Sequence, residues 1–252
     1  AGGSKNTFNI DDVGYATASA AGLTAGTITP TGASVGTKQG FSIVKFTGDS
    51  TTTGTIPHGL NKKPQFVIVK DLVNSDDWQI KFVDENRYLK LNGNNTGSTS
   101  YSNYTATDSV INLGYTWNND SSSHIAYCWH NVPGLQKFGS YTGNGNADGT
   151  FVELGFRASI VWVKRIDSAE NWYIIDTARD TYNLSGKTLQ ANTTNAQASV
   201  GGSFSATMDV LSNGFKLRDS GAGSNASGGT YVYCAWAEAP TVNLYGGHAN
   251  AR

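Results

Sequence analysis

Short runs of β-branched and aromatic residues alternate with turn residues from Gly40 to about residue 240. Small and bulky side chains alternate along Ile125–Trp129, which is typical of a strand with one inward face. No convincing amphipathic helix is found, and the best window, 176–182, is too short. The predicted strands are 41–47, 66–70, 78–83, 88–91, 109–115 and 124–130, then 138–142, 160–164, 172–176, 188–190, 208–217 (with a Gly turn) and 230–236.

The chain contains an internal repeat, because residues from about 41 to 134 recur at about 138 to 240. Pro64–Lys70 matches Ala158–Lys164 at a separation of 94, as Trp78 matches Trp172. The separation then grows in steps of six within Gly/Ser/Asn/Thr-rich stretches, as loop insertions would produce. The other matched pairs are Tyr88/Tyr182 at 94, Asn92/Asn192, Val110/Val210, Gly114/Gly214 and Tyr115/Phe215 at 100, and Cys128/Cys234 at 106.

The repeat predicts an all-β fold of two tandem homologous antiparallel β-sandwich units of jelly-roll type, preceded by an extended N-terminal arm. The expected boundaries are 1–38 for the arm or linker, 39–135 and 136–240 for the two units, and 241–252 for a C-terminal tail. Each unit has about six strands, so two small sandwiches and one sandwich shared by both halves are both open.

The amino-acid composition of the predicted arm differs from that of the two units. Gly14–Pro30 is uncharged, small and turn-rich, without helical period, and Thr27–Thr29 is the one stretch suited to a strand. We expect either an extended arm that lies along a neighbouring subunit or a flexible linker.

Composition narrows the function. Only 15% of residues are charged and the net charge is −1, so no basic surface for nucleic acid is expected. No apolar run approaches the length of a membrane span, so no membrane insertion is expected. A duplicated scaffold with many Tyr, Phe and Trp favours display, binding or assembly over a single catalytic centre.

Cys128 and Cys234 match each other in the repeat and lie at inward positions of predicted strands. A disulfide would require both sites to meet at a pseudo-twofold axis, with Cα atoms within about 7 Å. Buried free thiols are therefore favoured.

The chain is predicted not to be an enzyme. Its four histidines are scattered without metal-ligand spacing, and His58 lies in a turn sequence. Asp176 and Asp180 resemble a glycosidase carboxylate pair. Arg179 lies between them, which favours a surface cluster in which the Asp and Arg side chains pair with one another.

Cofactors are not expected, with calcium as the minor alternative. Asn144, Asn146 and Asp148 stand at alternate positions, like part of a calcium loop. Glu153 comes too early for an EF-hand and no helices flank the stretch, so a hairpin turn is favoured.

Aromatic residues divide into two groups. Trp78 and Trp172 recur in both copies, which favours a role in the core. The candidates for a glycan- or host-binding surface are the aromatics without a matched aromatic, namely Tyr101, Tyr104, Trp117 and Trp129.

Five stretches together resemble a repeat domain of marine bacteriophage structural proteins, often described as tail fibre or virion structural proteins of cyanophages. They are Gly36–Val44, Ile56–Leu60, Lys137–Phe151, Leu211–Arg218 and Asn225–Tyr231. The closing Asn243–Arg252 is similar to the C-terminal end of several such proteins. The resemblance covers about 36 to 252 and implies an exposed virion component without a cofactor; the family has no agreed catalytic residues to carry over.

The resulting hypothesis is a virion surface or extracellular protein of tail fibre or appendage type that attaches to a host-surface glycan or protein. The alternative is a self-assembling capsid decoration or filament subunit with a purely structural role, whose arm lies on a neighbour. The expected partners are accordingly other copies of the chain or other virion proteins, besides the host receptor.

Overall fold

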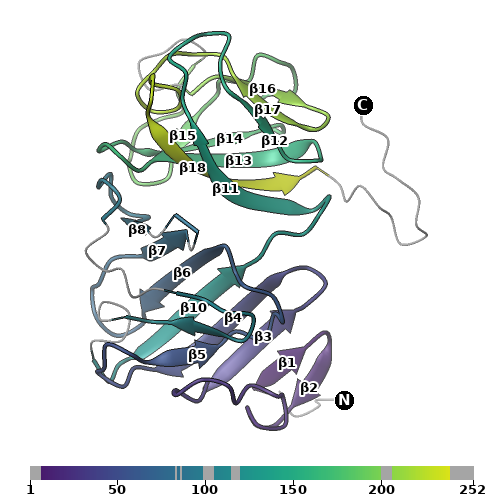
Figure 1. The fold of residues 1–252 in the computed structure, drawn as a ribbon, viewed down its shortest axis with the longest axis vertical. Coiled ribbons are helices and arrows are strands. Elements are labelled where there is room, and N and C mark those ends of the chain that lie inside the picture. Colours follow the sequence, from purple (N-terminus) through teal and green to yellow (C-terminus); the bar gives the residue numbers. More distant parts are fainter. Residues whose placement is uncertain are drawn as a thin grey trace, which may run out of the picture. The chain divides into compact units, whose positions relative to one another are not determined.

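The computed structural model describes residues 7–82, 84–85, 87–98, 105–114, 120–199 and 206–238. These residues form strands, turns and loops without a helix, so the all-β prediction is confirmed. No helix long and apolar enough to cross a membrane occurs among them. The chain divides into two compact units, which are described separately below (Figure 1). Unit 1 comprises residues 1–88 and 98–130, and unit 2 comprises residues 89–97 and 131–252.

Unit 1 is built from a large and a small sheet. The large sheet has the order β2-β1-β3-β4-β10-β6-β7-β8, and the small one pairs β5 with β9. Its strands are β1 (Phe8–Ile10), β2 (Val13–Tyr15), β3 (Gly32–Gly36), β4 (Phe41–Thr47), β5 (Thr55–Pro57), β6 (Phe66–Asp71), β7 (Gln79–Phe82), β8 (Arg87–Lys90), which runs into unit 2, β9 (Val110–Asn112) and β10 (Ser123–Trp129).

Unit 2 repeats this plan with a five-stranded sheet, β11-β18-β13-β14-β15, and a three-stranded sheet, β12-β17-β16. Its strands are β11 (Gln136–Thr142), β12 (Phe151–Glu153), β13 (Ala158–Arg165), β14 (Trp172–Asp176), β15 (Leu189–Gln190), β16 (Met208–Leu211), β17 (Gly214–Leu217) and β18 (Thr230–Ala237). The hairpin of β16 and β17 is the Gly turn that the sequence predicted.

Each unit has its own hydrophobic core between its two sheets. In unit 1, Val44, Val67 and Ala126 of the large sheet cluster with Ile56 and Ile111 of the small sheet. In unit 2 the core again draws on both sheets, with Val161, Val163 and Tyr233 on one side and Val152, Met208, Phe215 and Leu217 on the other. Of the two arrangements that the sequence left open, the structure therefore has two sandwiches.

The two units share one topology. The order β4-β10-β6-β7-β8 in unit 1 becomes β11-β18-β13-β14-β15 in unit 2 when each strand is replaced by its sequence counterpart. In the small sheets, β5 pairs with β9 as β12 pairs with β17. The repeat seen in the sequence is thus a repeat of strand pairing.

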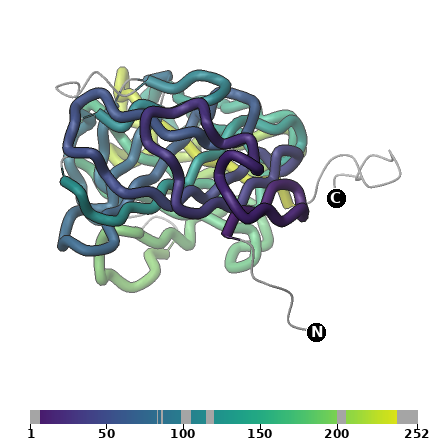
Figure 2. The backbone as a smooth tube through the Cα atoms, turned by 90° about the horizontal axis from the view of Figure 1, so that it is seen from below, coloured from purple at the N-terminus to yellow at the C-terminus, as the bar shows by residue number. Residues whose placement is uncertain are grey.

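The prediction of an extended arm over 1–38 was wrong for its described part. Strand β1 pairs in parallel with β3, and β3 pairs with β4, so this segment extends the large sheet. Phe8, Ala18 and Leu23 form a buried cluster of their own. Residues 7–36, at the purple end of the scale, wind within unit 1 (Figure 2). The sequence did not predict these strands, because they are short, turn residues surround them, and the buried residues are widely spaced.

The strand register corrects two matched positions. Val67 lies opposite Cys128, whereas Val161, 94 residues later, lies opposite Ala235. The counterpart of Cys128 is therefore Ala235, at 107 rather than 106, and Cys234 faces the other side of its sheet. A shift of one residue reverses the face of a strand, so matching the two identical cysteines gave the wrong register. Both cysteines are free and buried, as predicted.

The same argument moves β9. Ile111 lies opposite Ile56 as Phe215 lies opposite Val152, so β9 corresponds to β17 at a separation of 104 rather than 100. The boundary between the units falls after residue 130 rather than 135.

Candidate functional site

The predicted aromatic surface is only partly within the described residues. Tyr101, Tyr104 and Trp117 lie outside them. Trp129 is half-buried on β10, where its ring stacks on Phe41 at 4.7 Å and on Phe66 at 5.1 Å. Packing accounts for this ring, and its role in binding remains a prediction.

Trp129 does have an aromatic counterpart, contrary to the sequence interpretation. Trp129 lies opposite Phe66, and Trp236 lies opposite Ile160, 94 residues after Phe66. Trp236 packs edge-to-face on Phe138 and Trp162. The one-residue change of register had concealed this pair.

Trp78 and Trp172 share a position but not an environment. Trp172 is buried, as predicted, whereas Trp78 is exposed, so the prediction of a core role for Trp78 was wrong. Trp172 also donates two hydrogen bonds, from its backbone N–H to Asn192 Oδ1 at 2.9 Å and from its indole N–H to Lys90 O at 2.8 Å.

The calcium-like loop is a turn. Asn144 Oδ1 accepts the N–H of Asn146, and Asn146 Oδ1 accepts the N–H of Asp148. Asp148 pairs with Lys216 and lies near Arg218, and these contacts lower its pKa. Oxygens that cap backbone N–H groups and face cations are poorly placed to surround Ca²⁺.

Asp176 and Asp180 also serve the local structure. Asp176 Oδ2 accepts Arg179 Nε at 2.6 Å, and Asp180 Oδ2 accepts the N–H groups of Gly186 and Lys187. Burial acts to raise the pKa of Asp180, but the hydrogen bonds outweigh it and the pKa is lowered. A glycosidase acid needs a raised pKa, so the pair fits the paired surface cluster better.

His58 is more than a turn residue. It is buried, its Nε2 lies 3.1 Å from Thr107 O, and its Nδ1 accepts the N–H of Leu60 at 3.2 Å. Because a carbonyl only accepts, the proton is on Nε2 and the ring is neutral. Loss of hydration lowers the pKa of His58.

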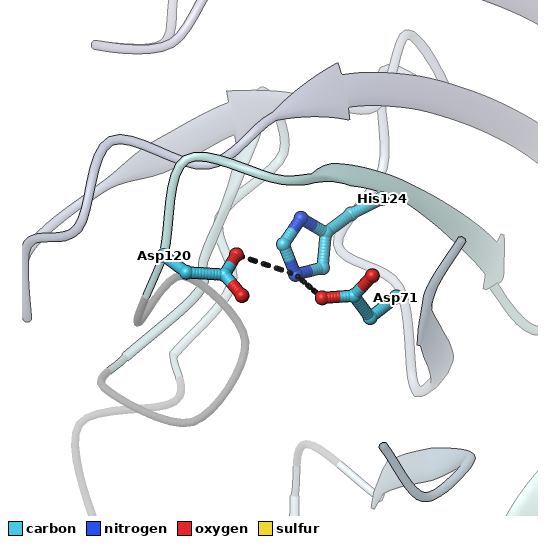
Figure 3. Close-up of side chains that lie close together, drawn as sticks. All are labelled: Asp71, Asp120 and His124. Atoms are coloured by element: carbon cyan, nitrogen blue, oxygen red, sulfur yellow. Dashed lines mark ion pairs between the residues drawn. The ribbon is translucent and has the colours of Figure 1, made fainter. Parts of the chain in front are cut away.

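Asp71, Asp120 and His124 point toward one another in unit 1 (Figure 3). Asp71 ends β6, Asp120 precedes β10, and His124 lies on β10. His124 Nδ1 donates to Ser122 O, so its Nε2 faces Asp71 Oδ2 at 3.5 Å and Asp120 Oδ1 at 3.9 Å. A histidine and two carboxylates in this arrangement resemble a divalent-cation site.

The hydrogen bonds of Asp71 do not fit a metal ligand. Its Oδ2 accepts Ser122 Oγ at 2.5 Å and Asn74 Nδ2 at 3.0 Å, which uses both lone pairs of that oxygen. Its Oδ1 accepts the N–H groups of Val73 and Asn74. We therefore describe the cluster as a clamp that fastens the β6–β7 loop to the start of β10.

A different site arises in unit 2 from two equivalent turns. Turn A is residues 89–97 and turn B is residues 189–197, 100 residues later. Ser98 N donates to Tyr88 O beside turn A as Ala198 N donates to Thr188 O beside turn B. The counterpart of Tyr88 is thus Thr188 rather than Tyr182. Trp172 fixes both turns through its bonds to Lys90 and Asn192.

The two turns line an open groove with a volume of about 560 Å³. Its lining residues are Asn92, Ala191, Asn192, Thr193, Thr194 and Asn195, none of which is charged. The groove is shallow and open to solvent rather than an enclosed cavity. Amides and hydroxyls can each donate and accept hydrogen bonds, as the hydroxyl groups of a neutral sugar require.

Sequence reasoning had matched Asn92 with Asn192 but had not placed the two turns together. The available signal was a pair of amides with the same spacing in both turns. These are Asn92 and Asn95 in turn A, and Asn192 and Asn195 in turn B. It was overlooked because polar, Asn-rich loops are common in this chain.

Comparison with known proteins gives one match. No curated protein and no solved structure matches the chain. Residues 10–240 match a family described as a domain of unknown function, DUF7483. The match begins within β1 and ends beyond β18, so it spans both units. The chain therefore belongs to the DUF7483 family.

Proposed function

We propose that this chain is an outward-facing attachment protein of a bacteriophage virion, which binds uncharged glycans of the host surface. The groove of unit 2 carries the proposal, because its six lining residues offer amides and hydroxyls without charge. The phage setting rests on the sequence resemblance alone, because a sandwich fold does not by itself imply a function.

Binding through this groove would be modest for a single sugar. The groove is open, so a ligand keeps much of its hydration and gains few buried contacts. Recognition would rest on several hydrogen bonds of about 0.5–1.5 kcal/mol each. The predicted aromatics Tyr101, Tyr104 and Trp117 remain candidates for a stacking surface that would add to it.

The test is binding of the intact chain to an array of neutral and charged oligosaccharides, followed by titration calorimetry with the best neutral ligand. We expect Thr194→Asp to abolish binding, because it places a carboxylate in the groove, and Thr194→Ala to weaken it several-fold. Thr181→Ala is the matched control, since Thr181 is exposed in unit 2 and does not line the groove.

Unchanged binding in Thr194→Asp would exclude the groove as the site. If Tyr101→Ala or Trp117→Ala then abolished binding, the glycan site would lie on the predicted aromatic surface instead. Released oligosaccharide after incubation with host polysaccharide would show an enzyme and contradict the proposal.

A further inference from the structure

Turn A is docked on a surface of unit 2 made of Lys164, Ile166 and Trp172. Lys164 Nζ donates to Asn95 O at 2.9 Å, Gly97 N donates to Ile166 O at 2.8 Å, and Trp172 Nε1 donates to Lys90 O at 2.8 Å. Ile166 and Trp172 are each 1% exposed and Lys164 is fully buried. Burial lowers the pKa of Lys164 to about 8. We call these three residues the docking surface.

Unit 1 carries the equivalent surface, and its apolar side chains are exposed. The counterparts 94 residues earlier are Lys70, Leu72 and Trp78. Leu72 is 51% exposed and Trp78 is 38% exposed, and the neighbouring Val73 is 70% exposed. Exposed apolar side chains grouped in one region are a common feature of protein interaction sites.

Turn B is the equivalent of turn A and is exposed where turn A is buried. Leu89 is fully buried in turn A, whereas Leu189 is 37% exposed in turn B. Gly97 is buried and its counterpart Gln197 is exposed. Turn A is therefore docked on its surface, whereas turn B and the surface of Lys70, Leu72 and Trp78 are both exposed and have complementary counterparts.

We propose that copies of this chain associate head to tail, with turn B of one copy docked on Lys70, Leu72 and Trp78 of the next. Each contact would repeat the internal joint of turn A with Lys164, Ile166 and Trp172. The two contacting surfaces differ, so the contact is heterologous and propagates into a filament or closes into a ring. Repeat proteins with uncapped ends associate for the same reason.

The chemistry of both surfaces suits this contact. Lys70 Nζ donates to Asp71 O at 2.7 Å and Asn74 O at 3.3 Å, which leaves a third N–H of the ammonium for Asn195 O of the partner copy. The clamp at Asp71 holds the loop that carries Leu72 and Val73 in one conformation, which lowers the entropy cost of binding. Gln197 replaces Gly97, but the bond expected at this position uses only the backbone N–H.

Association would leave part of the proposed glycan groove accessible, although the backbone oxygen of Asn195, a groove residue, would face the partner copy. In the docked turn A, the side chains of Asn92, Asn94 and Thr96 remain exposed. The equivalent Asn192 and Thr194 of a docked turn B would keep the same outward direction. A head-to-tail assembly would therefore present grooves at regular intervals.

Sedimentation velocity of the full chain over a series of concentrations tests the proposal. We expect species beyond dimer in the wild type, and monomer only in Leu72→Glu and in Leu189→Glu. Val13→Glu is the matched control, since Val13 is 54% exposed in unit 1 on β2, and it should assemble like the wild type. An equal mixture of the two defective variants should stop at dimer, because it contains one intact surface and one intact turn.

A wild type that stays monomeric at every concentration would overturn the proposal. So would assembly of Leu72→Glu like the wild type, loss of assembly in Val13→Glu, or growth of the mixture beyond dimer.

Disulfide trapping gives an independent measurement if the association is weak. Gly97 N and Ile166 O are hydrogen-bonded, so the equivalent Gln197 and Leu72 of adjacent copies should come within the reach of about 7 Å between Cα atoms. The double variant Leu72→Cys/Gln197→Cys should form a ladder of linked oligomers on mild oxidation. Val13→Cys/Gln197→Cys is the control, and the absence of a ladder, or the same ladder in the control, would contradict the head-to-tail contact.

Discussion

His124 of β10 and Tyr231 of β18 occupy the same position in the two large sheets, with charges of opposite sign beside them. His124 stacks on Phe46 at 5.2 Å, and Tyr231 stacks on Tyr141 at 5.0 Å. His124 faces Asp71, whereas Tyr231 lies under Arg165, the counterpart of Asp71, at 5.9 Å. A phenol ring attracts a cation, and the ring nitrogen of His124 lies beside a carboxylate, so the same stack has a neighbour of different charge in each copy.

The clamp in unit 1 leads to the first prediction, for Asp71→Asn. An amide NH₂ cannot accept hydrogen bonds, so two of the four donors on this buried carboxylate lose their acceptor. We expect the free energy of unfolding to fall by about 2–4 kcal/mol. Chemical denaturation measures it, and Asp84→Asn is the control because its exposed ion pair with Lys63 contributes at most about 1 kcal/mol.

The stabilisation by Asp71 should vanish in acid. Burial acts to raise the pKa of Asp71, but hydrogen bonds from Ser122, Asn74 and Val73 hold it far below 3.8. A carboxyl with a lowered pKa stabilises the fold above its unfolded pKa and loses that effect as the pH falls. The difference between wild type and Asp71→Asn should shrink below pH 3.8, and a constant difference would contradict the assignment.

His58 predicts a second pH effect, of different origin. Its pKa is lowered by burial, so below about pH 6.5 the unfolded chain binds a proton that the folded chain does not. The contribution of the neutral His58 ring to the free energy of unfolding is therefore fully present above pH 6.5, and it declines as the pH falls below 6.5. His58→Gln should be less stable at pH 7 but should show a smaller decline between pH 7 and 5, as followed by thermal unfolding. An equal decline in both proteins would exclude His58 as its source.

Gly214 predicts a steric effect in unit 2. A Cβ at this position would overlap the carbonyl oxygen of Val152, because β12 and β17 approach closely at their paired ends. We expect Gly214→Ala to lower the free energy of unfolding by about 1–3 kcal/mol. Gly93→Ala is the control, since its Cβ would meet only ordinary contacts, and it should change stability by less than about 0.5 kcal/mol.

The two proposals together predict an avidity effect. Leu189→Glu should leave the affinity for a soluble oligosaccharide unchanged, because Leu189 does not line the groove. It should weaken retention on a dense glycan surface by about 10-fold or more, because isolated copies lose multivalent binding. Surface plasmon resonance at high and low glycan density measures both, and equal retention of wild type and variant would separate assembly from attachment.

Much of the fold could be read from local patterns. The strands at 41–47 and 172–176 have the predicted bounds, because alternation and β-branched residues report directly on a half-buried strand. The duplication was equally accessible, since packing the same topology twice demands similar residues at similar spacing. The short strands β1 to β3 were missed because three to five residues give too little pattern to distinguish a strand from a turn.

The candidate site was less accessible, because it depends on which surfaces meet. Leu72 and Ile166, or Trp78 and Trp172, are indistinguishable as matched apolar letters, and only the position of turn A buries one of each pair. The groove likewise exists because Trp172 holds two turns that lie 100 residues apart. Composition and periodicity alone determined an all-β duplicated chain, since they record local preference. Tertiary structure decided the strand register, the clamp at Asp71, and which of the equivalent turns and surfaces are exposed. These features depend on contacts between residues that no local pattern connects.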